Sequence, residues 1–164
     1  MITKNQIKFL RSLSQKKYRI QSQKFLVEGK RIVKELIQSS ALIDQIYVSE
    51  DFIVKNADFI LFDSNITYEI IPNDVISKIK TTDSSQEVFA ISFINNSLDI
   101  QIQTPILVLD DISDPGNLGT LLRSASWYGI NNVLVSSKSV DIYNPKVVRS
   151  AMGAHFHITN LHQL

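Results

Sequence analysis

The chain has 164 residues, of which 44% are hydrophobic and 20% are charged, and this ordinary globular composition excludes a disordered polymer. It contains no cysteine, so disulfides and thiolate metal sites are excluded as well. No apolar run approaches the roughly 20 residues that a membrane helix needs, and the first residues lack the apolar core of a signal peptide. We therefore expect a cytoplasmic protein without membrane contact.

The net charge of +1 conceals a strong asymmetry along the chain. Residues 1–39 hold ten of the 17 lysines and arginines and only two acids, so this segment carries +8 and the remainder −7. Contacts to phosphates supply most non-specific affinity for nucleic acids, so a basic segment of this kind suggests a polyanionic partner. A solvated helix face is the alternative interpretation.

Hydrophobic periodicity predicts alternating helices and strands over the first part of the chain. The predicted elements are, in order, a helix within 4–15, a strand at 25–27, a helix at 30–38, strands at 44–48 and 59–62, a helix around 75–79 and a strand at 88–94. Among the aromatic residues, Phe59, Phe62 and Phe89 are expected in the core. The pattern indicates a small mixed α/β domain over residues 1–95.

A polar, turn-prone segment at 96–104 is the predicted linker, and the character of the sequence changes after it. Three short apolar runs then predict strands, with a helix in each interval between them. The runs are 106–109, 133–135 and 156–159, and the predicted helices cover 118–128 and part of 144–153. The order β-α-β-α-β implies a parallel sheet with right-handed crossovers, whose first strand is expected to be buried on both faces.

The richest polar segment, residues 110–123, lies where a buried strand gives way to a helix, which is where α/β sheets place ligand sites. Gly119 permits close approach of a second backbone or of a ligand. Asn117 and Arg123 offer an amide and a planar cation, which suit a ribose-phosphate substrate. The alternative is a helix capped by Asn117, with Arg123 as an ordinary surface residue.

Two long stretches are more specific than this local pattern. Residues 114–125 read DPGNLGTLLRSA, and residues 139–154 read SVDIYNPKVVRSAMGA. They resemble the first and second signature motifs of the SpoU/TrmH family of RNA 2′-O-ribose methyltransferases. Upstream, residues 24–31 and 81–86 resemble parts of the RNA-binding domain that many members carry.

The resemblance implies an α/β fold in two parts. Residues 1–95 would form a small ribosomal-protein-like RNA-binding domain, residues 96–104 a linker, and residues 105–164 an incomplete parallel-sheet SPOUT domain of the trefoil-knot type. The family's third motif, which contains Ser-Leu-Asn, is not found in the chain. We therefore expect a C-terminally truncated chain that lacks most of the cofactor site, and no cofactor-binding residue is assigned.

The resemblance also implies S-adenosylmethionine-dependent 2′-O-ribose methylation of structured RNA, ribosomal rather than transfer RNA, by a protein that is a homodimer at full length. The catalytic residues would be Arg123 and Asn117, and no metal is required. A guanidinium stays protonated in proteins, so orienting the hydroxyl and stabilising charge suit Arg123 better than acting as a base.

The basic segment supplies the expected contacts to RNA. The candidate substrate contacts are Lys16, Lys17, Arg19, Lys30, Arg31 and, from the second motif, Arg149. For Arg149, a structural ion pair with an acid such as Asp141 is the alternative. Trp127 and Tyr128 are expected in core or dimer packing, and His155 and His157 on one face of a strand rather than at a metal.

Two other functions compete with the enzyme: a catalytically inactive RNA-binding fragment, and a dimerisation module. Binding of S-adenosylmethionine would distinguish them. For residues 1–164 we expect no binding tighter than about 1 mM, or about −4 kcal/mol. We also expect a C-terminal half that is less stable than the N-terminal domain and frayed from Ser136 onward.

Overall fold

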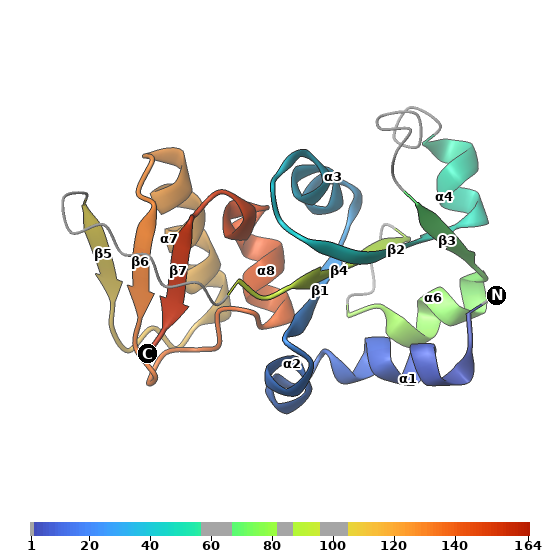
Figure 1. The fold of residues 1–164 in the computed structure, drawn as a ribbon, viewed down its shortest axis with the longest axis horizontal. Coiled ribbons are helices and arrows are strands. Elements are labelled where there is room, and N and C mark those ends of the chain that lie inside the picture. Colours follow the sequence, from blue (N-terminus) through green and yellow to red (C-terminus); the bar gives the residue numbers. More distant parts are fainter. Residues whose placement is uncertain (1, 57–66, 82–86, 96–104) are drawn as a thin grey trace.

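The computed structural model describes residues 2–56, 67–81, 87–95 and 105–164. Two α/β units lie side by side, each built around its own sheet (Figure 1). The predicted linker at 96–104, the predicted strand at 59–62 with Phe59 and Phe62, and most of the 81–86 segment lie outside the described residues.

The first unit holds a four-stranded sheet of order β1-β4-β2-β3, in which β4 is antiparallel to β1 and β2, and β3 is parallel to β2. Its elements are α1 (Lys4–Ser12), α2 (Lys16–Ser22), β1 (Lys24–Glu28), α3 (Lys30–Gln38), β2 (Ile43–Ser49), α4 (Glu50–Lys55), β3 (Tyr68–Ile71), α6 (Asn73–Ile79) and β4 (Val88–Phe93). The helix predicted at 30–38 and the strands predicted near 25–27, 44–48 and 88–94 are confirmed.

Three elements of this unit were not predicted: α2, α4 and β3. The helical pattern at 4–15 ends earlier than expected, because α1 stops at Ser12 and a separate helix begins at Lys16. The start of α1 is fixed by Thr3, whose side chain accepts a hydrogen bond from the Gln6 backbone at 3.2 Å while the Gln6 side chain accepts one from the Thr3 backbone at 2.8 Å.

Helices cover both faces of this sheet, so the unit has three layers. Along β4, Val88 and Ala90 face a core shared with α3 and α4, whereas Phe89 and Ile91 face a second core shared with α1 and α6. Phe89 is fully buried, as predicted. The alternation follows from the twofold repeat of a strand, which sends successive side chains to opposite faces.

The second unit is a parallel sheet of order β5-β6-β7, as predicted. Its elements are β5 (Ile106–Leu109), α7 (Pro115–Trp127), β6 (Asn132–Val135), α8 (Pro145–Ala151), the 3-10 helix η1 (Ala154–Phe156) and β7 (Asn160–Gln163). The strand predicted at 156–159 is wrong, because the chain first makes η1 and extends only from Asn160. His155 therefore lies in η1 and His157 caps it, and the two do not share a strand face.

The sheet of the second unit is covered by helices on one face. Val133 and Val135 of β6 and Leu161 of β7 pack in one cluster with Leu118 and Leu122 of α7. On the edge strand β5, Leu109 joins this cluster, but Ile106 is 40% exposed and Val108 is 62% exposed. The expectation that residues 106–109 are buried on both faces is therefore wrong.

The two units pack against each other through α8, η1 and β1. Val148 of α8 belongs to the core cluster on the α3 side of the first sheet. The ring of Phe25 lies 4.7 Å from the Tyr143 ring and 6.3 Å from the Phe156 ring, measured between centroids. Gly153 lies so close to α3 that an added Cβ would be 2.8 Å from the Glu35 Cβ. The two units therefore have separate sheets but pack against each other.

Candidate functional site

The first turn of α7 presents the residues of the first motif. Asp114 caps the helix, and its Oδ1 accepts a hydrogen bond from the Asn117 backbone at 2.7 Å. Pro115 follows as the first helical residue, where a missing N–H costs nothing. The alternative in which Asn117 is the cap is wrong, because Asp114 holds that position and leaves the Asn117 side chain exposed.

Gly119 lies at the crossing of α7 and α8. A Cβ there would be 2.0 Å from Ser150 Oγ and 2.8 Å from the Ala151 nitrogen, so only glycine fits. The Ser150 hydroxyl lies 2.7 Å from the Lys146 carbonyl of its own helix and 3.1 Å from the Pro115 carbonyl of α7, so it contacts both helices at this point. The close approach predicted for Gly119 is therefore made by a helix of the same chain.

Asn117 and Arg123 are both exposed on α7. Within the part of the chain that the structure describes, neither side chain has a hydrogen-bonding or ionic partner. Six residues on a helix correspond to a rise of about 9 Å and an angular separation of about 120° around the helix axis. The two groups can therefore meet an extended ligand such as a nucleotide, and a small ion could not bridge them.

Arg149 of α8 is engaged within the protein. Its Nη1 donates to the Thr81 hydroxyl and lies 3.7 Å from Glu28 Oε2. The Glu28 carboxylate is 5% exposed and also accepts from the Thr81 hydroxyl and, at 3.1 Å, from the Thr81 backbone. The ion-pair alternative thus describes Arg149 better than a substrate contact, with Glu28 as the acid in place of Asp141.

Arg19 is not available to RNA, which corrects its assignment as a substrate contact. Its side chain is 3% exposed, donates to the Leu13 carbonyl at 2.7 Å and is paired with Asp141. The two partners are far apart in sequence and join α2 to the segment between β6 and α8. The sequence alone could not predict this pair, because the acid that a buried arginine needs can come from anywhere in the chain.

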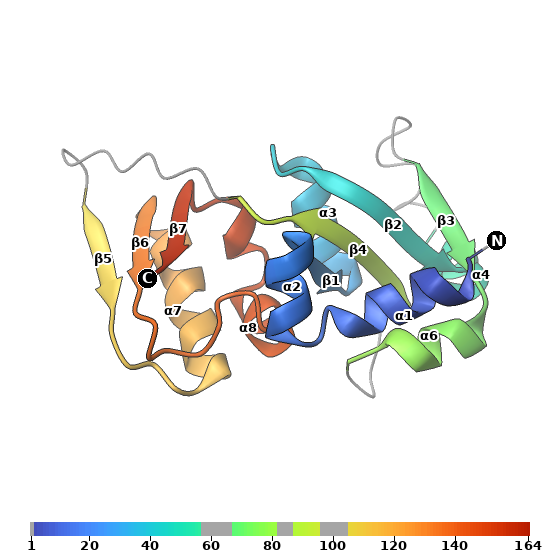
Figure 2. The same cartoon turned by 60° about the horizontal axis from the view of Figure 1, so that its bottom comes forward.

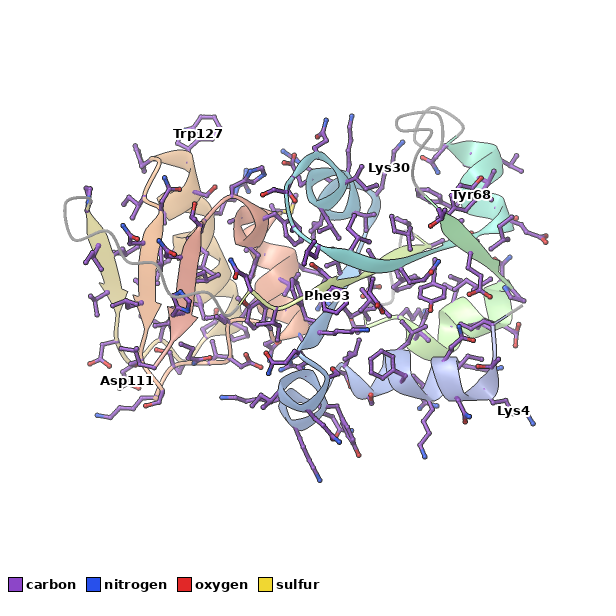
Figure 3. The ribbon with its side chains drawn as sticks, viewed as in Figure 1. Lys4, Lys30, Tyr68, Phe93, Asp111 and Trp127 are labelled. Atoms are coloured by element: carbon purple, nitrogen blue, oxygen red, sulfur yellow. The ribbon has the colours of Figure 1, made fainter. Side chains whose placement is uncertain are left out.

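The other basic candidates are divided between two layers of the first unit. Lys16 and Lys17 are exposed on α2. Arg31 is exposed at the start of α3, whereas the Lys30 ammonium donates to the Asn56 side chain at 2.8 Å. Figure 3 shows Lys30 and Lys4 on opposite sides of the sheet. The basic segment therefore does not form one continuous patch.

Trp127 and Tyr128, at the end of α7, are 85% and 79% exposed, so core packing within this chain is wrong for both. Figure 3 shows Trp127 projecting from the outer end of the helix. Dimer packing stays a prediction for these two rings.

His155 is a structural residue. Burial lowers its pKa to about 4, against the opposing effects of the Ile142 carbonyl and the Asp141 carboxylate. The neutral ring donates from Nε2 to the Ile142 carbonyl at 2.7 Å, which leaves Nδ1 buried without a partner. Among the described residues no three His, Asp or Glu side chains are grouped in a way that could hold a metal ion.

The carboxyl end of the second sheet carries a polar network. The Ser136 and Ser139 hydroxyls accept from the backbones of Asp111 and Ile112 at 3.1 and 2.9 Å. The Gln163 amide donates to carbonyls of the segment after β6, at 3.1 Å from that of Ser139. These groups are engaged with one another, and a cavity of about 300 Å³ beside them is lined by Ser137, Asp141 and Gln163 among others.

Each half of the chain matches the model of a known protein family. Residues 4–90 match the MRM3-like substrate binding domain, and residues 104–164 match the SpoU rRNA Methylase family. None of the helices in the described ranges has the length and apolar character needed to cross a bilayer.

Among curated proteins, the chain is 30% identical over 156 residues to the 23S rRNA (guanosine(2553)-2'-O)-methyltransferase RlmP of Bacillus subtilis, covering 94% of this chain and 61% of that protein. It is 29% identical over 154 residues to the human mitochondrial rRNA methyltransferase 3, covering 90% of this chain and 37% of that one. The chain thus spans about three fifths of the bacterial relative and little more than a third of the human one.

Two solved structures that resemble this chain are also RNA methyltransferases by their descriptions. A Porphyromonas gingivalis structure described as an RNA methyltransferase of the TrmH family shares 32% identity at a TM-score of 0.84, covering 100% of this chain and 63% of that one. An AdoMet-bound rRNA methyltransferase from Sinorhizobium meliloti shares 28% identity at a TM-score of 0.76, covering 99% and 62%.

Proposed function

The chain belongs to the SpoU/TrmH family of RNA methyltransferases, and from this membership we propose that it takes part in S-adenosylmethionine-dependent 2′-O-ribose methylation of ribosomal RNA. Residues 1–95 bind the RNA, residues 96–104 link the two parts, and residues 105–164 begin the methyltransferase domain. Ribosomal RNA is the proposed substrate because the relatives named above act on it.

The observation that carries this proposal is the exposed, unpartnered pair Asn117 and Arg123 on the helix that follows β5. Asp114 and Gly119 fix this helix end by capping it and by packing it on α8, so both polar groups are presented on a rigid element. We assign Arg123 to orienting the ribose hydroxyl and stabilising the charge that develops on its oxygen. Asn117, about 9 Å away along the helix, shapes the same substrate site by contacting another part of the nucleotide through its amide.

S-adenosylmethionine supplies the methyl group as a sulfonium. The polar groups at the carboxyl end of the second sheet are engaged with one another and leave no described side chain that we can assign to this cofactor. We therefore assign it no contact. The same observation favours a second candidate, in which these residues alone bind RNA without catalysis.

A homodimer is the proposed assembly. The exposed Trp127 and Tyr128 on α7, and Ile106 and Val108 on the bare face of β5, are apolar side chains that a second copy could cover. Aromatic rings are enriched at interfaces, and homodimer interfaces are more apolar than the rest of the surface.

The test measures transfer of a labelled methyl group from S-adenosylmethionine to 23S rRNA by the chain extended through a C-terminal segment like that of the Bacillus relative. Arg123→Ala should abolish transfer and leave cofactor affinity nearly intact, because the arginine is assigned to the substrate side. Arg123→Lys should also be poor, since a point charge does not replace a planar fork.

The exposed Lys55 of α4 provides the control, because Lys55→Ala removes one cation outside both motifs. A near-normal rate for Arg123→Ala would refute the assigned role. Absence of transfer by the unsubstituted extended chain, with RNA binding retained, would favour the second candidate.

A further inference from the structure

An open groove runs between α1 and α2 and has a volume of about 1010 Å³. That volume is at the upper end of the range of small-ligand pockets, which runs from about 300 to 1,000 Å³. Figure 2 brings the two helices forward along the same face of the first unit. The groove is outside the two motifs and outside the candidate residues predicted from the sequence.

The groove is lined by apolar, uncharged polar and basic residues, and its charged residues are all basic. Lys4, Lys8 and Arg11 of α1 line it, and none of the three has an ion-pair partner among the described residues. The first acid in the sequence is Glu28, so neither helix carries a carboxylate. On α6, which packs beside α1, Asp74 is already paired with Lys78 at 2.7 Å. Lys4, Lys8 and Arg11 therefore give the groove a positive charge, and no carboxylate of either helix opposes it.

An aromatic ring shares the groove with these cations. Tyr18 of α2 lines it and is 39% exposed, and the Lys17 ammonium lies 5.9 Å from the centre of its ring. Asn5 and Gln21 add amides that can both donate and accept. Cations that follow a backbone, combined with a ring on which a base can stack, are the features of sites for single-stranded nucleic acid.

The buried side chain of Arg19 holds α1 and α2 in position around the groove. Arg19 follows Tyr18 in α2, but its side chain runs inward and donates to Leu13 in the turn between α1 and α2. The same guanidinium pairs with Asp141 of the second unit. It therefore fixes the shape of the groove and also its position relative to α7, which carries Asn117 and Arg123.

We propose that the α1–α2 groove binds a single-stranded segment of the RNA substrate, as a contact separate from Lys30 and Arg31 in the opposite layer. The proposal rests on the proposed function and adds to it a site and a form of RNA. Lys4, Lys8 and Arg11 neutralise phosphates, and Tyr18 stacks on a base.

The test uses the chain itself with two fluorescent probes, a mixed-sequence RNA of about 12 nucleotides and the same strand annealed to its complement. Affinity for each is measured by fluorescence anisotropy over a range of salt concentrations. The double variant Lys8→Ala, Arg11→Ala should weaken binding of the single strand about tenfold or more. The slope of log K against log salt should fall by roughly 0.7 for each phosphate that is no longer neutralised.

The matched control is Lys55→Ala, Lys138→Ala, which removes the same charge at two exposed lysines outside the groove and outside both motifs. It should leave the affinity within about twofold. Tyr18→Ala should weaken the single strand about fivefold and leave the duplex unchanged, whereas Tyr18→Phe should behave like the unsubstituted chain, because the ring is what stacks.

The outcomes separate this inference from the proposed function. Equal losses in the groove variant and its control, or an equal effect of Tyr18→Ala on both probes, would overturn the groove and leave the proposed function standing. A chain that binds neither probe would also overturn the groove, and the proposed function would then be decided by the methyl-transfer test with the extended chain. Circular dichroism of each variant excludes misfolding as the cause of a loss.

Discussion

A single residue, Arg19, shows how far charge alone can mislead about function. It stands in a run with Lys16 and Lys17, so composition groups the three as one basic patch. The helix separates them, because the two lysines face solvent while Arg19 points inward. Its charge is matched by Asp141, so Arg19 contributes to the architecture and the lysines remain available to RNA.

Removing one partner of this pair should be costly. Arg19→Ala leaves the Asp141 carboxylate largely buried without its cation, so we expect a loss of about 3–5 kcal/mol in the free energy of unfolding. The double variant Arg19→Met, Asp141→Leu should be more stable than the single one, because no unpaired charge remains. Urea unfolding measures both.

The control is the more exposed pair Lys24–Asp44, joined at 2.7 Å with side chains 22% and 29% exposed. Lys24→Ala should cost less than about 1 kcal/mol, as is usual for pairs in contact with water. Equal losses for the two single variants would mean that the Arg19–Asp141 pair is no more important than a surface contact.

His155 should make stability depend on pH. Burial lowers its pKa to about 4 from an ordinary value of 6.5, so the unfolded chain binds a proton that the folded chain rejects between these values. Stability should therefore be fully present above about pH 6.5 and fall as the pH drops toward 4, by up to about 1.4 kcal/mol per pH unit. The free energy of unfolding from urea titrations between pH 4 and 7 measures the slope.

His155→Gln should reduce the slope of the free energy of unfolding against pH, because the variant lacks the one proton that the unfolded chain binds at this position. His157→Gln, which removes an imidazole that is 45% exposed, serves as the control and should keep most of the slope. If the two variants have the same slope, burial of His155 does not govern the pH dependence.

At the scale of elements, the α7–α8 crossing determines where the motif residues lie. Gly119 packs on α8, and Asn117 lies on the opposite side of α7. Arg123, four residues after Gly119, lies on nearly the same side as the glycine and is exposed one turn further along the helix. The second motif supplies the other side, because Ser150 and Ala151 are the residues that Gly119 meets.

Gly119→Ala should therefore destabilise the chain, although alanine favours a helix by about 1 kcal/mol over glycine. The added Cβ would lie 2.8 Å from the Ala151 backbone nitrogen, which cannot move without shifting α8. We expect a net loss of about 1–3 kcal/mol, the usual cost of overpacking a core. Differential scanning calorimetry would record it as a lower Tm.

Ser124→Ala, on the exposed side of the same helix, is the matched control and should leave Tm nearly unchanged. A Gly119→Ala variant as stable as this control would show that the two helices can separate at no cost.

At the scale of the whole molecule, the described helices cover both faces of the first sheet and one face of the second. The first sheet has helices on both sides, whereas Ile106 and Val108 of β5 remain exposed on the second. Exposed branched side chains on an edge strand favour association with another strand or another copy. The exposed side chains of β5 are therefore where we expect a second copy of the chain to bind.

Val108→Lys should reduce self-association of the chain, because a charge on the bare face opposes its burial. Sedimentation velocity over a range of protein concentrations would show a smaller shift toward dimers and larger species than in the unsubstituted chain. Val54→Lys replaces a valine that is 82% exposed on α4 and should leave association unchanged. Similar behaviour of the two variants would place the association surface elsewhere.

The local sequence determined the elements whose signals are local. Helix α3, strands β1, β2 and β4, the parallel order of the second sheet and the early proline of α8 all follow from short-range periodicity and turn chemistry. The two motifs likewise indicated the family, because long runs in a fixed order are specific. The elements α2, α4 and β3 and the η1 turn before β7 were not predicted, because the apolar residues of these short segments form neither a long continuous run nor a distinct apolar face in the local sequence.

Only the tertiary structure decided which polar groups are free. Arg19 and Arg149 resemble the other basic residues in sequence, yet acids far along the chain neutralise them, while Asn117 and Arg123 stay without partners among the described residues. The same holds for the division of the basic segment between two layers and for the groove between α1 and α2. The physical reason is that burial and pairing depend on distances between residues remote in sequence, and local pattern contains no information about those distances until the chain has folded.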